Sequence, residues 1–338
     1  MISTWLGLDI GGANLKLADL NGGHREREFA LWKAPDQLSG GIRELLAGYP
    51  AETSLAVTMT GELADCYRDA TTGVRAIANA VVKAAPGAKQ CLFYDLAGRF
   101  STFTELNERP DDHAASNWHA LASLVSRSLT DNALLIDIGS TTCDIIPLEP
   151  GRVATTARTD FDRLIRRQLV YVGVRRTPVC AIVDTLPFAE HEVPVMNELF
   201  STVDDCALLL GLTADSGTDL DTADGRPRTR SFACGRMSKM LGLDHRKFAM
   251  ADAVRCAQSV ITALRQKILS AIAQQGSHSH WILSGHGSPL LESDLPTDVE
   301  RCQKLRAIWG EGLSRVAPAY AVACLASELA SPRQSPHR

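Results

Sequence analysis

Apolar residues in the first part of the chain follow the spacing of β-strands. Three consecutive runs, 4–10, 15–20 and 26–33, predict an antiparallel meander. The next segment, 37–47, carries apolar residues at helical spacing, and 54–60 is a continuous apolar run typical of a buried strand. The chain is therefore expected to begin strand–strand–strand–helix–strand.

The rest of the chain repeats this order and then becomes mainly helical. Before residue 130 the pattern predicts helices at 63–67, 73–85 and 113–129, and strands at 91–96 and 100–106. A second series follows, with a hairpin at 134–148, a strand at 152–157, a helix at 161–172 and a strand at 179–183. Later elements are helices at 199–210, 231–241, 250–275 and 317–329, and a strand at 281–284.

Two stretches resemble each other and open the two series. Residues 6–20 read LGLDIGGANLKLADL, and residues 134–148 read LLIDIGSTTCDIIPL. Each holds an Asp-x-Gly turn between apolar strands, at Asp9–Gly11 and at Asp137–Gly139. Any buried strand that ends in a turn can look like this, but the recurrence favours a chain built from two related halves.

Both turns have the chemistry of a phosphate site. Small residues leave backbone N–H groups unblocked, and an acidic residue at the entry can hold a metal ion. We expect Asp9 and Asp137 to be catalytic and to bind Mg²⁺ through water. The candidate phosphate ligands are Gly11, Gly12, Asn14, Gly139, Ser140, Thr141 and Thr142. Lys16 is a further candidate, although at strand spacing it could equally point to solvent.

Composition excludes several classes of protein. With 338 residues, 45% of them hydrophobic and 22% charged, the chain suits two globular domains. A net charge of −4 provides no basic footprint for nucleic acid. No apolar stretch approaches the about 20 residues of a membrane span, and the N-terminus lacks the pattern of a signal peptide. Nine cysteines without a close C-x-x-C pair indicate reduced thiols, so we expect a cytoplasmic protein.

The order of elements resembles the actin, heat-shock chaperone and sugar kinase superfamily. That resemblance implies an α/β fold in which two ribonuclease-H-like domains face a central cleft. The expected domains are 1–130 and 131–330, the second with a helical insertion at about 195–275, followed by a disordered tail at 331–338. A late glycine turn at 284–288, with Gly285 and Gly287, would hold adenosine or its equivalent.

Five longer matches are more specific. They are MTGEL (59–63), SNWHA (116–120), GVRRTPVCA (173–181), TADGRP (222–227) and LSGHG (283–287). Together they resemble the hydantoinase/oxoprolinase-like family linked to tetrahydromethanopterin-dependent C1 transfer. The archaeal relatives include a condensing enzyme of methanofuran biosynthesis. The resemblance implies a transferase that joins an aminomethylfuran-methyl diphosphate to a tyramine- or tyrosine-type phenol and releases diphosphate, with Mg²⁺ in the cleft.

The implied reaction needs a base and a site for the acceptor. A phenol has a pKa of about 10, so its ionisation at neutral pH needs help. Glu62 is the candidate base because it follows the end of a buried strand; it could instead stabilise a helix beginning at residue 63. Arg175 and Arg176 are candidates to bind carboxylates of the acceptor, or they form a solvated turn. Asn117 is a candidate substrate ligand, or an ordinary polar residue of its helix.

Other functions remain open from the sequence. The same fold would suit an ATP-dependent small-molecule kinase or ATPase, with ATP in the cleft, or a nucleotide-binding sensor that turns nothing over. The irregular polar segment 215–230 is either a disordered loop or a lid over the substrate. The expected partners are small molecules, with neither nucleic acid nor membrane, and a homo-oligomer is left open.

Overall fold

The computed structural model describes residues 5–292 and 295–330, and the tail expected at 331–338 lies outside them. The described residues divide into two units. Unit 1 comprises 5–134, 146–163 and 303–330, and unit 2 comprises 135–145 and 164–302. This division differs from the continuous ranges 1–130 and 131–330 expected above, because the C-terminal segment of the chain packs with the N-terminal strands.

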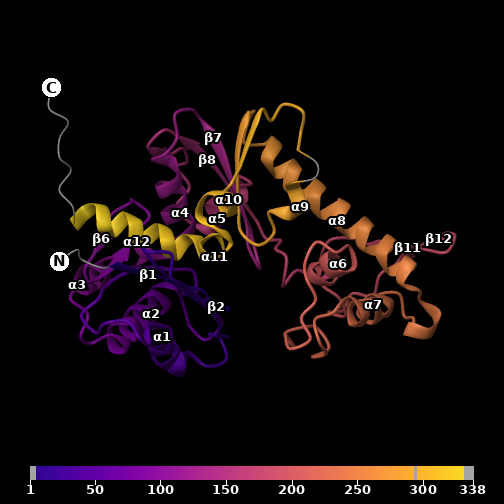
Figure 1. Cartoon of the computed structure of the whole chain (residues 1–338), viewed down its shortest axis with the longest axis horizontal. Coiled ribbons are helices and arrows are strands. Elements are labelled where there is room, and N and C mark those ends of the chain that lie inside the picture. The colour runs from indigo at the N-terminus through magenta and orange to yellow at the C-terminus, as the bar shows by residue number, and fades with distance from the viewer. Residues whose placement is uncertain (1–4, 293–294, 331–338) are drawn as a thin grey trace. The chain divides into compact units, whose positions relative to one another are not determined.

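Unit 1 is built on a six-stranded sheet of the order β3-β2-β1-β4-β5-β6. Figure 1 labels β1, β2 and β6 of this sheet, with α1 and α2 near β1. The first three strands form the expected antiparallel meander, and β1 pairs in parallel with β4, as β4 does with β5. This is the order of a ribonuclease-H-like domain. The strands are β1 (Trp5–Ile10), β2 (Asn14–Asp19), β3 (His24–Glu28), β4 (Ser54–Met59), β5 (Cys91–Tyr94) and β6 (Phe100–Ser101).

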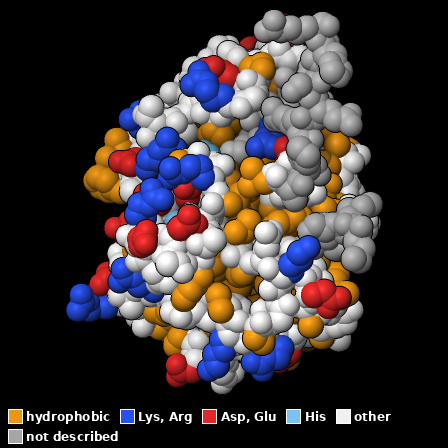
Figure 2. All heavy atoms as spheres, turned by 90° about the vertical axis from the view of Figure 1, so that its left-hand side faces the viewer, with side chains coloured by type: hydrophobic (Ala, Val, Ile, Leu, Met, Phe, Trp, Pro, Cys, Tyr) orange, Lys and Arg blue, Asp and Glu red, His pale blue; other side chains and the backbone are white. Residues whose placement is uncertain are grey.

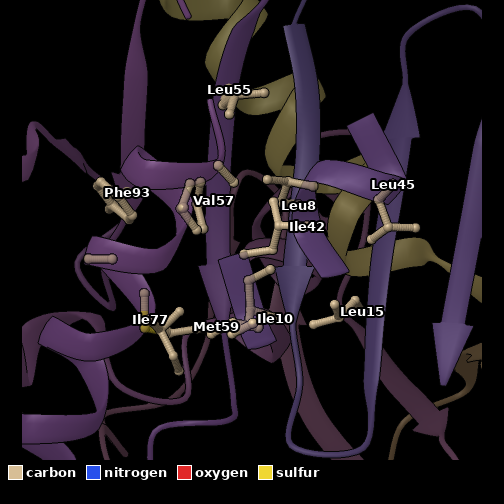
Figure 3. Packing of buried hydrophobic residues seen from close by; sticks show 14 of the residues in the cluster. Leu8, Ile10, Leu15, Ile42, Leu45, Leu55, Val57, Met59, Ile77 and Phe93 are labelled. Atoms are coloured by element: carbon tan, nitrogen blue, oxygen red, sulfur yellow. The ribbon is translucent and has the colours of Figure 1, made fainter. Parts of the chain in front are cut away.

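The two faces of this sheet are covered by different helices. Leu8 and Ile10 of β1 belong to a core shared with α1 (Leu38–Leu46) and α2 (Ala70–Ala84), which Figure 3 shows. Trp5, on the opposite face of β1, packs with residues of α4 (Asn117–Ser126) and α12 (Ala317–Ala330). Since side chains alternate along a strand, Asp9 lies on the same face as Trp5.

The last helix contacts the first strand so closely that only glycine fits at the crossing. A Cβ at Gly7 would lie 1.8 Å from the carbonyl oxygen of Ala319 in α12. Ala18 of β2, which pairs with Gly7, is also small and packs against Val316 and Ala319. A stripe of small residues therefore seats α12 on the sheet.

Three elements of unit 1 differ from expectation, and local capping explains two of them. The predicted helix at 63–67 is a series of turns, and α2 begins only at Ala70, where the Asp69 carboxylate accepts from the Thr72 N–H at 2.7 Å. The strand predicted at 100–106 ends early because Thr102 starts α3 (Phe103–Glu108) with a capping box. The helix predicted at 113–129 is divided into a 3-10 turn (Pro110–His113) and α4.

The second sheet has the order β10-β8-β7-β13-β14, with β9 paired to β8. Its central hairpin confirms the one predicted at 134–148. The predicted helix at 161–172 is instead α5 (Asp160–Ile165) followed by a strand, because Arg167 turns the backbone with φ of +56°. The strand predicted at 179–183 is a 3-10 turn. The strands are β7 (Ala133–Ile138), β8 (Cys143–Glu149), β9 (Arg152–Val153), β10 (Leu169–Val170), β13 (His280–Ser284) and β14 (Arg301–Lys304).

The helical part of unit 2 is held together by buried ion pairs. Arg228 donates to both carboxylate oxygens of Asp204, at 2.6 and 2.7 Å. Arg236 donates to Asp205 at 2.6 Å and to Asp224 at 3.1 Å. The segment 215–230 is therefore an irregular loop anchored by charge. The surrounding elements are α6 (Val203–Leu209), α7 (Arg230–Lys239), α8 (Met250–Ala273) and the hairpin of β11 (Thr185–Phe188) and β12 (His191–Pro194).

Three further short helices lie between β13 and α12, and the apolar pattern of the sequence did not predict them. They are α9 (Pro289–Glu292), α10 (Leu305–Trp309) and α11 (Glu311–Arg315). Within 5–292 and 295–330, no helix is long and apolar enough to cross a bilayer. On the face drawn in Figure 2, acidic and basic side chains lie next to one another, as expected for a chain with a small net charge.

The Gly7 crossing leads to a stability prediction. We expect Gly7→Ala to lower the free energy of unfolding by about 2–4 kcal/mol, because the added methyl group forces α12 away from β1. The matched control is Gly235→Ala in α7, where a Cβ meets no atom within 4 Å. That variant should be neutral or more stable by up to about 1 kcal/mol. Chemical denaturation of both variants measures the difference, and equal stability would contradict the close packing.

Candidate active site

Asp9 lies at the carboxyl end of β1, buried to 4% exposure. Its cross-strand neighbours are Lys16 on β2 and Thr58 on β4. Burial raises the pKa of Asp9 to about 6, although Lys16 and a hydrogen bond from Asn117 oppose the shift. Among the described residues, none donates a hydrogen bond to Oδ1 of Asp9. This carboxylate therefore has a buried oxygen available to a ligand.

Lys16 belongs to the same face of the sheet as Asp9. On β2, the middle strand of the meander, Lys16 pairs with Asp9 of β1 on one side and with Glu26 of β3 on the other. Residues directly opposite in antiparallel strands point to one face. Of the two orientations left open by the sequence, the side chain takes the one toward the candidate site.

Glu62 follows β4 and is buried to 2% exposure. Burial raises its pKa to about 7, with the nearby charges of Asp160 and Asp9 adding to the shift. The backbone N–H groups of Glu62 and Ala115 donate to the carboxylate and lower the pKa in part. Its Oε2 accepts no hydrogen bond from the described part of the chain. With no helix at 63–67, the alternative role of Glu62 at a helix N-terminus is wrong.

The ends of β1 and β4 are tied to one another, which brings the two carboxylates into electrostatic contact. The N–H groups of Thr60 and Gly61 both donate to the Ile10 carbonyl, at 3.0 and 3.1 Å. Glu62 comes next in the chain, so it is held beside the turn that follows Asp9. A carboxyl whose pKa is near 7 can accept a proton at neutral pH, which is the requirement for a general base.

The segment SNWHA supports both carboxylates. The Ser116 N–H donates to the Met59 carbonyl at 3.0 Å, and its hydroxyl lies 2.7 Å from that of Thr58. Ala115, which donates to Glu62, has φ of +47°, a strained value for a residue with a side chain. The Asn117 side chain bonds Asp9 and accepts from the Trp118 N–H at 2.6 Å. Asn117, predicted as a substrate ligand, is thus placed to orient Asp9.

Two charged residues near Glu62 were not predicted. The negative charge of Asp160 in α5 raises the pKa of Glu62. The Asp160 carboxylate also accepts a hydrogen bond from Arg163 at 2.9 Å. The Arg163 guanidinium lies 4.6 Å from the centre of the Trp118 ring. The contact of α5 with α4, made by Arg163 and Trp118, brings Asp160 near Glu62.

In unit 2 the predicted phosphate turn is enclosed by two glycine-containing segments. The turn closes with the Gly139 N–H donating to the Thr142 carbonyl at 2.8 Å. A Cβ at Gly173 would lie 2.4 Å from the Thr141 nitrogen, so that segment contacts the turn directly. The N–H groups of Arg175 and Arg176 donate to the Ser140 carbonyl at 3.0 and 3.1 Å. The structure therefore brings GVRR and the second turn together.

The late glycine turn contacts the other side of the same hairpin. A Cβ at Gly285 would lie 2.6 Å from Oδ1 of Asp137, and the Gly287 N–H donates to the Ile138 carbonyl at 2.9 Å. Gly285 has φ of +80°, which favours glycine. Asp137, Gly139 to Thr142, Gly173 and the turn at Gly285 and Gly287 consequently form one cluster. Cys143 beside them is fully buried and is a packing residue.

The two arginines differ in their surroundings. Arg175 donates to Asp219 at 2.9 Å and lies 3.5 Å from Asp221, so carboxylates of the 215–230 loop already contact its guanidinium. Arg176 has an exposed side chain. Arg175 is thus a carboxylate-binding residue, and in this structure the carboxylates belong to the chain itself.

The described residues contain no group of three or more His, Cys, Asp or Glu side chains placed to hold a metal ion. A magnesium ion that keeps most of its water needs only one or two carboxylates. Asp9 fits that requirement, because its Oδ1 is buried and without a donor.

Comparison with known proteins identifies the family. Residues 54–323 match the hydantoinase/oxoprolinase family. The chain belongs to this family. A relative in Methanocaldococcus jannaschii, (4-{4-[2-(gamma-L-glutamylamino)ethyl]phenoxymethyl}furan-2-yl)methanamine synthase, is 32% identical over 95% of this chain and 96% of its own. The protein of the same name in Methanococcus vannielii is 27% identical over 60% of this chain and 95% of its own.

The fold of this hydantoinase/oxoprolinase family member also occurs among solved structures. Acetone carboxylase in its nucleotide-free form aligns with a TM-score of 0.52 and 10% identity, over 96% of this chain and 70% of that chain. At such low identity the likeness concerns the fold alone. Together with the strand order, it supports the predicted α/β fold class.

The raised pKa of Glu62 predicts how stability depends on pH. Its pKa moves from the usual 4.5 to about 7 on folding, so the folded state binds the proton more tightly. The carboxyl is neutral in both states below pH 4.5, and stability falls as the pH rises from 4.5 to about 7. Glu62→Gln, which mimics the neutral acid, should gain up to roughly 3 kcal/mol relative to the native protein over that range.

Chemical denaturation between pH 4.5 and 8 measures this gain. Glu108→Gln, an exposed glutamate of unit 1, is the matched control and should show no such trend. A stability difference between native protein and Glu62→Gln that stays constant over the range would rule out the raised pKa.

Proposed function

We propose that this protein synthesises a methanofuran-type C1 carrier by forming an aryl–O–CH2–furan ether. The name of its 32%-identical relative contains that linkage, a phenoxymethyl group on a furan. In the reaction, the phenol oxygen bonds to the furfuryl carbon and the bond from that carbon to the diphosphate oxygen breaks. The phenol proton passes to a base on the protein, and diphosphate leaves with the electron pair of the broken bond.

The main support for this chemistry is Glu62, the candidate base. Ether formation by a phenol at neutral pH requires a base that is partly ionised there, and burial brings the pKa of Glu62 to about 7. Its Oε2 lacks a donor from the described protein and can receive the phenol proton. Asp160 and Asp9 strengthen the basicity of Glu62 through their charges.

The glycine turns suit the leaving group. Diphosphate develops charge as it departs, and backbone N–H groups with a nearby cation stabilise such charge. Each unit carries its own candidate phosphate turn. In unit 1 it comprises Gly11, Gly12, Asn14 and Lys16, and in unit 2 Gly139–Thr142 with Gly285 and Gly287; the N–H groups of Gly11 and Gly139 close their turns onto the Asn14 and Thr142 carbonyls. Packing supports the second of these candidates, since Gly173 and Gly285 hold that turn in place.

Magnesium would assist the departure of diphosphate. Asp9 and Asp137 are the candidate ligands, through water, and the unpartnered Oδ1 of Asp9 supports the first of them. When bound, the ion would neutralise charge on the diphosphate oxygens. Asn117 holds the Asp9 carboxylate in place, which makes it a positioning residue.

The acceptor site is assigned to the segment GVRRTPVCA. Both Arg175 and Arg176 are anchored by their N–H groups to the Ser140 carbonyl of the second turn. An acceptor carboxylate at Arg175 would replace Asp219 or Asp221, since these occupy its guanidinium. The substrate therefore competes with the 215–230 loop for this arginine.

A mass-spectrometric turnover assay tests the function. Purified protein with Mg²⁺ is offered aminomethylfuran-methyl diphosphate together with tyramine, tyrosine or their glutamyl forms, and in a separate arm ATP alone. We expect an ether product and one equivalent of diphosphate. Asp9→Asn should reduce the rate by about 100-fold or more, and Asp65→Asn, at an exposed position, should leave it unchanged. ADP without ether would instead indicate a kinase or ATPase.

Glu62→Gln tests the base separately. At pH 7–8 we expect its kcat to fall by about 10²–10⁴, the range for loss of a general base. The ratio of native to variant kcat should become about tenfold smaller by pH 9.5, because a substantial fraction of a phenol of pKa about 10 is then ionised without a base. In the native enzyme the rate should rise through pH 7 as Glu62 loses its proton. An equal loss at every pH would remove Glu62 from this role.

A further inference from the structure

A separate pocket of about 370 Å³ lies on the face of the unit 1 sheet opposite Asp9. Its walls come from the end of β3, from the first half of α1 with the turn before it, and from the end of α2. Arg27 of β3 points to this side, because it pairs with Glu44 of α1, whereas its neighbour Glu26 faces Lys16 on the other side. None of the candidate active-site residues lines the pocket.

The charges around the pocket favour an anion. Three cationic side chains line it, against two carboxylates. Arg27 is paired with Glu44. Arg43 and Lys83 have no acidic partner among the described residues. Set against Asp36, the second carboxylate in the lining, Arg43 and Lys83 leave the pocket with one net positive charge.

Ser39 gives the second indication of a ligand. It lines the pocket at 8% exposure, and its hydroxyl has no hydrogen-bond partner in the described parts of the chain. A buried hydroxyl without a partner is unfavourable and calls for an explanation. Ser39 also lies in the first turn of α1, which continues the 3-10 turn Pro35–Gln37; the Leu38 N–H donates to the Pro35 carbonyl.

Gly40 and Gly41 are consecutive glycines of α1, a position where glycine is unfavourable by about 1 kcal/mol relative to alanine. For Gly41 the cause is packing, because a Cβ there would lie 3.1 Å from Leu15 and 3.2 Å from the Phe29 ring. For Gly40 no protein atom lies within 4 Å of such a Cβ, which would project into open space. The bare backbone at Gly40 lines the pocket and leaves room for a ligand against the helix.

We propose that this pocket is a binding site for a small phosphate-class anion, distinct from the candidate active site. The Ser39 hydroxyl and the backbone at Gly40 would contact the anion, and Arg43 and Lys83 would neutralise its charge. The volume admits inorganic phosphate or the phosphate end of a small ester. This site does not depend on the proposed synthase activity.

Nuclear magnetic resonance of the full chain labelled with ¹⁵N-glycine tests the site with inorganic phosphate as the probe, at constant ionic strength set with chloride. We expect a saturable shift of the Gly40 amide. Arg43→Ala should weaken the apparent affinity about tenfold, whereas Arg68→Ala, the same charge change at an exposed position of unit 1, should not. Shifts of the Gly11 and Gly12 amides would report phosphate at the turn after β1 in the candidate active site, and their titration curves are fitted separately.

Gly40→Ala provides a variant that keeps the fold. Without phosphate it should raise the melting temperature, because alanine favours the helix and its methyl group meets no protein atom. It should nevertheless weaken phosphate binding at least fivefold. Absence of a saturable Gly40 shift, or binding unchanged in both Arg43→Ala and Gly40→Ala, would overturn the proposal.

Discussion

Burial of two carboxylates at the ends of β1 and β4 is the constraint on which the candidate active site depends. A carboxylate removed from water resists ionisation unless donors or cations replace the lost solvation. Asp9 and Glu62 each keep one oxygen without a donor from the described chain, so their pKa values rise to about 6 and 7. The surrounding packing keeps both carboxylates away from water and so maintains the raised pKa values.

That packing is supplied from distant parts of the sequence. Seating α12 on Gly7 closes one face of the sheet, and the tie between Ser116 and the end of β4 brings Ala115 to Glu62. α5 adds the charge of Asp160. The motif MTGEL alone therefore does not set the properties of its glutamate, because the solvation of Glu62 is decided by segments before and after it.

Unit 2 illustrates a different arrangement, in which glycines permit close contact between backbones. Gly173 and Gly285 each lie against the Asp137–Thr142 hairpin at distances that exclude any side chain. Arg175 is fixed to this hairpin by its N–H and to the 215–230 loop by its guanidinium. The loop and the turn are thereby linked through one residue.

The sequence by itself predicted the antiparallel meander of the first sheet and the two Asp-x-Gly hairpins, because alternating apolar residues and glycine turns are local signals. Its five longer motifs indicated the family. It also placed Glu62 past a buried strand. The apolar spacing mispredicted several short elements, because caps at Asp69 and Thr102 and the backbone turn at Arg167 decide where those elements begin and end. Only the tertiary structure decided that Asn117 orients Asp9, that Arg175 pairs with the chain's own aspartates, and that Asp160 approaches Glu62. Those outcomes depend on burial and on contacts between distant residues, which no local pattern encodes.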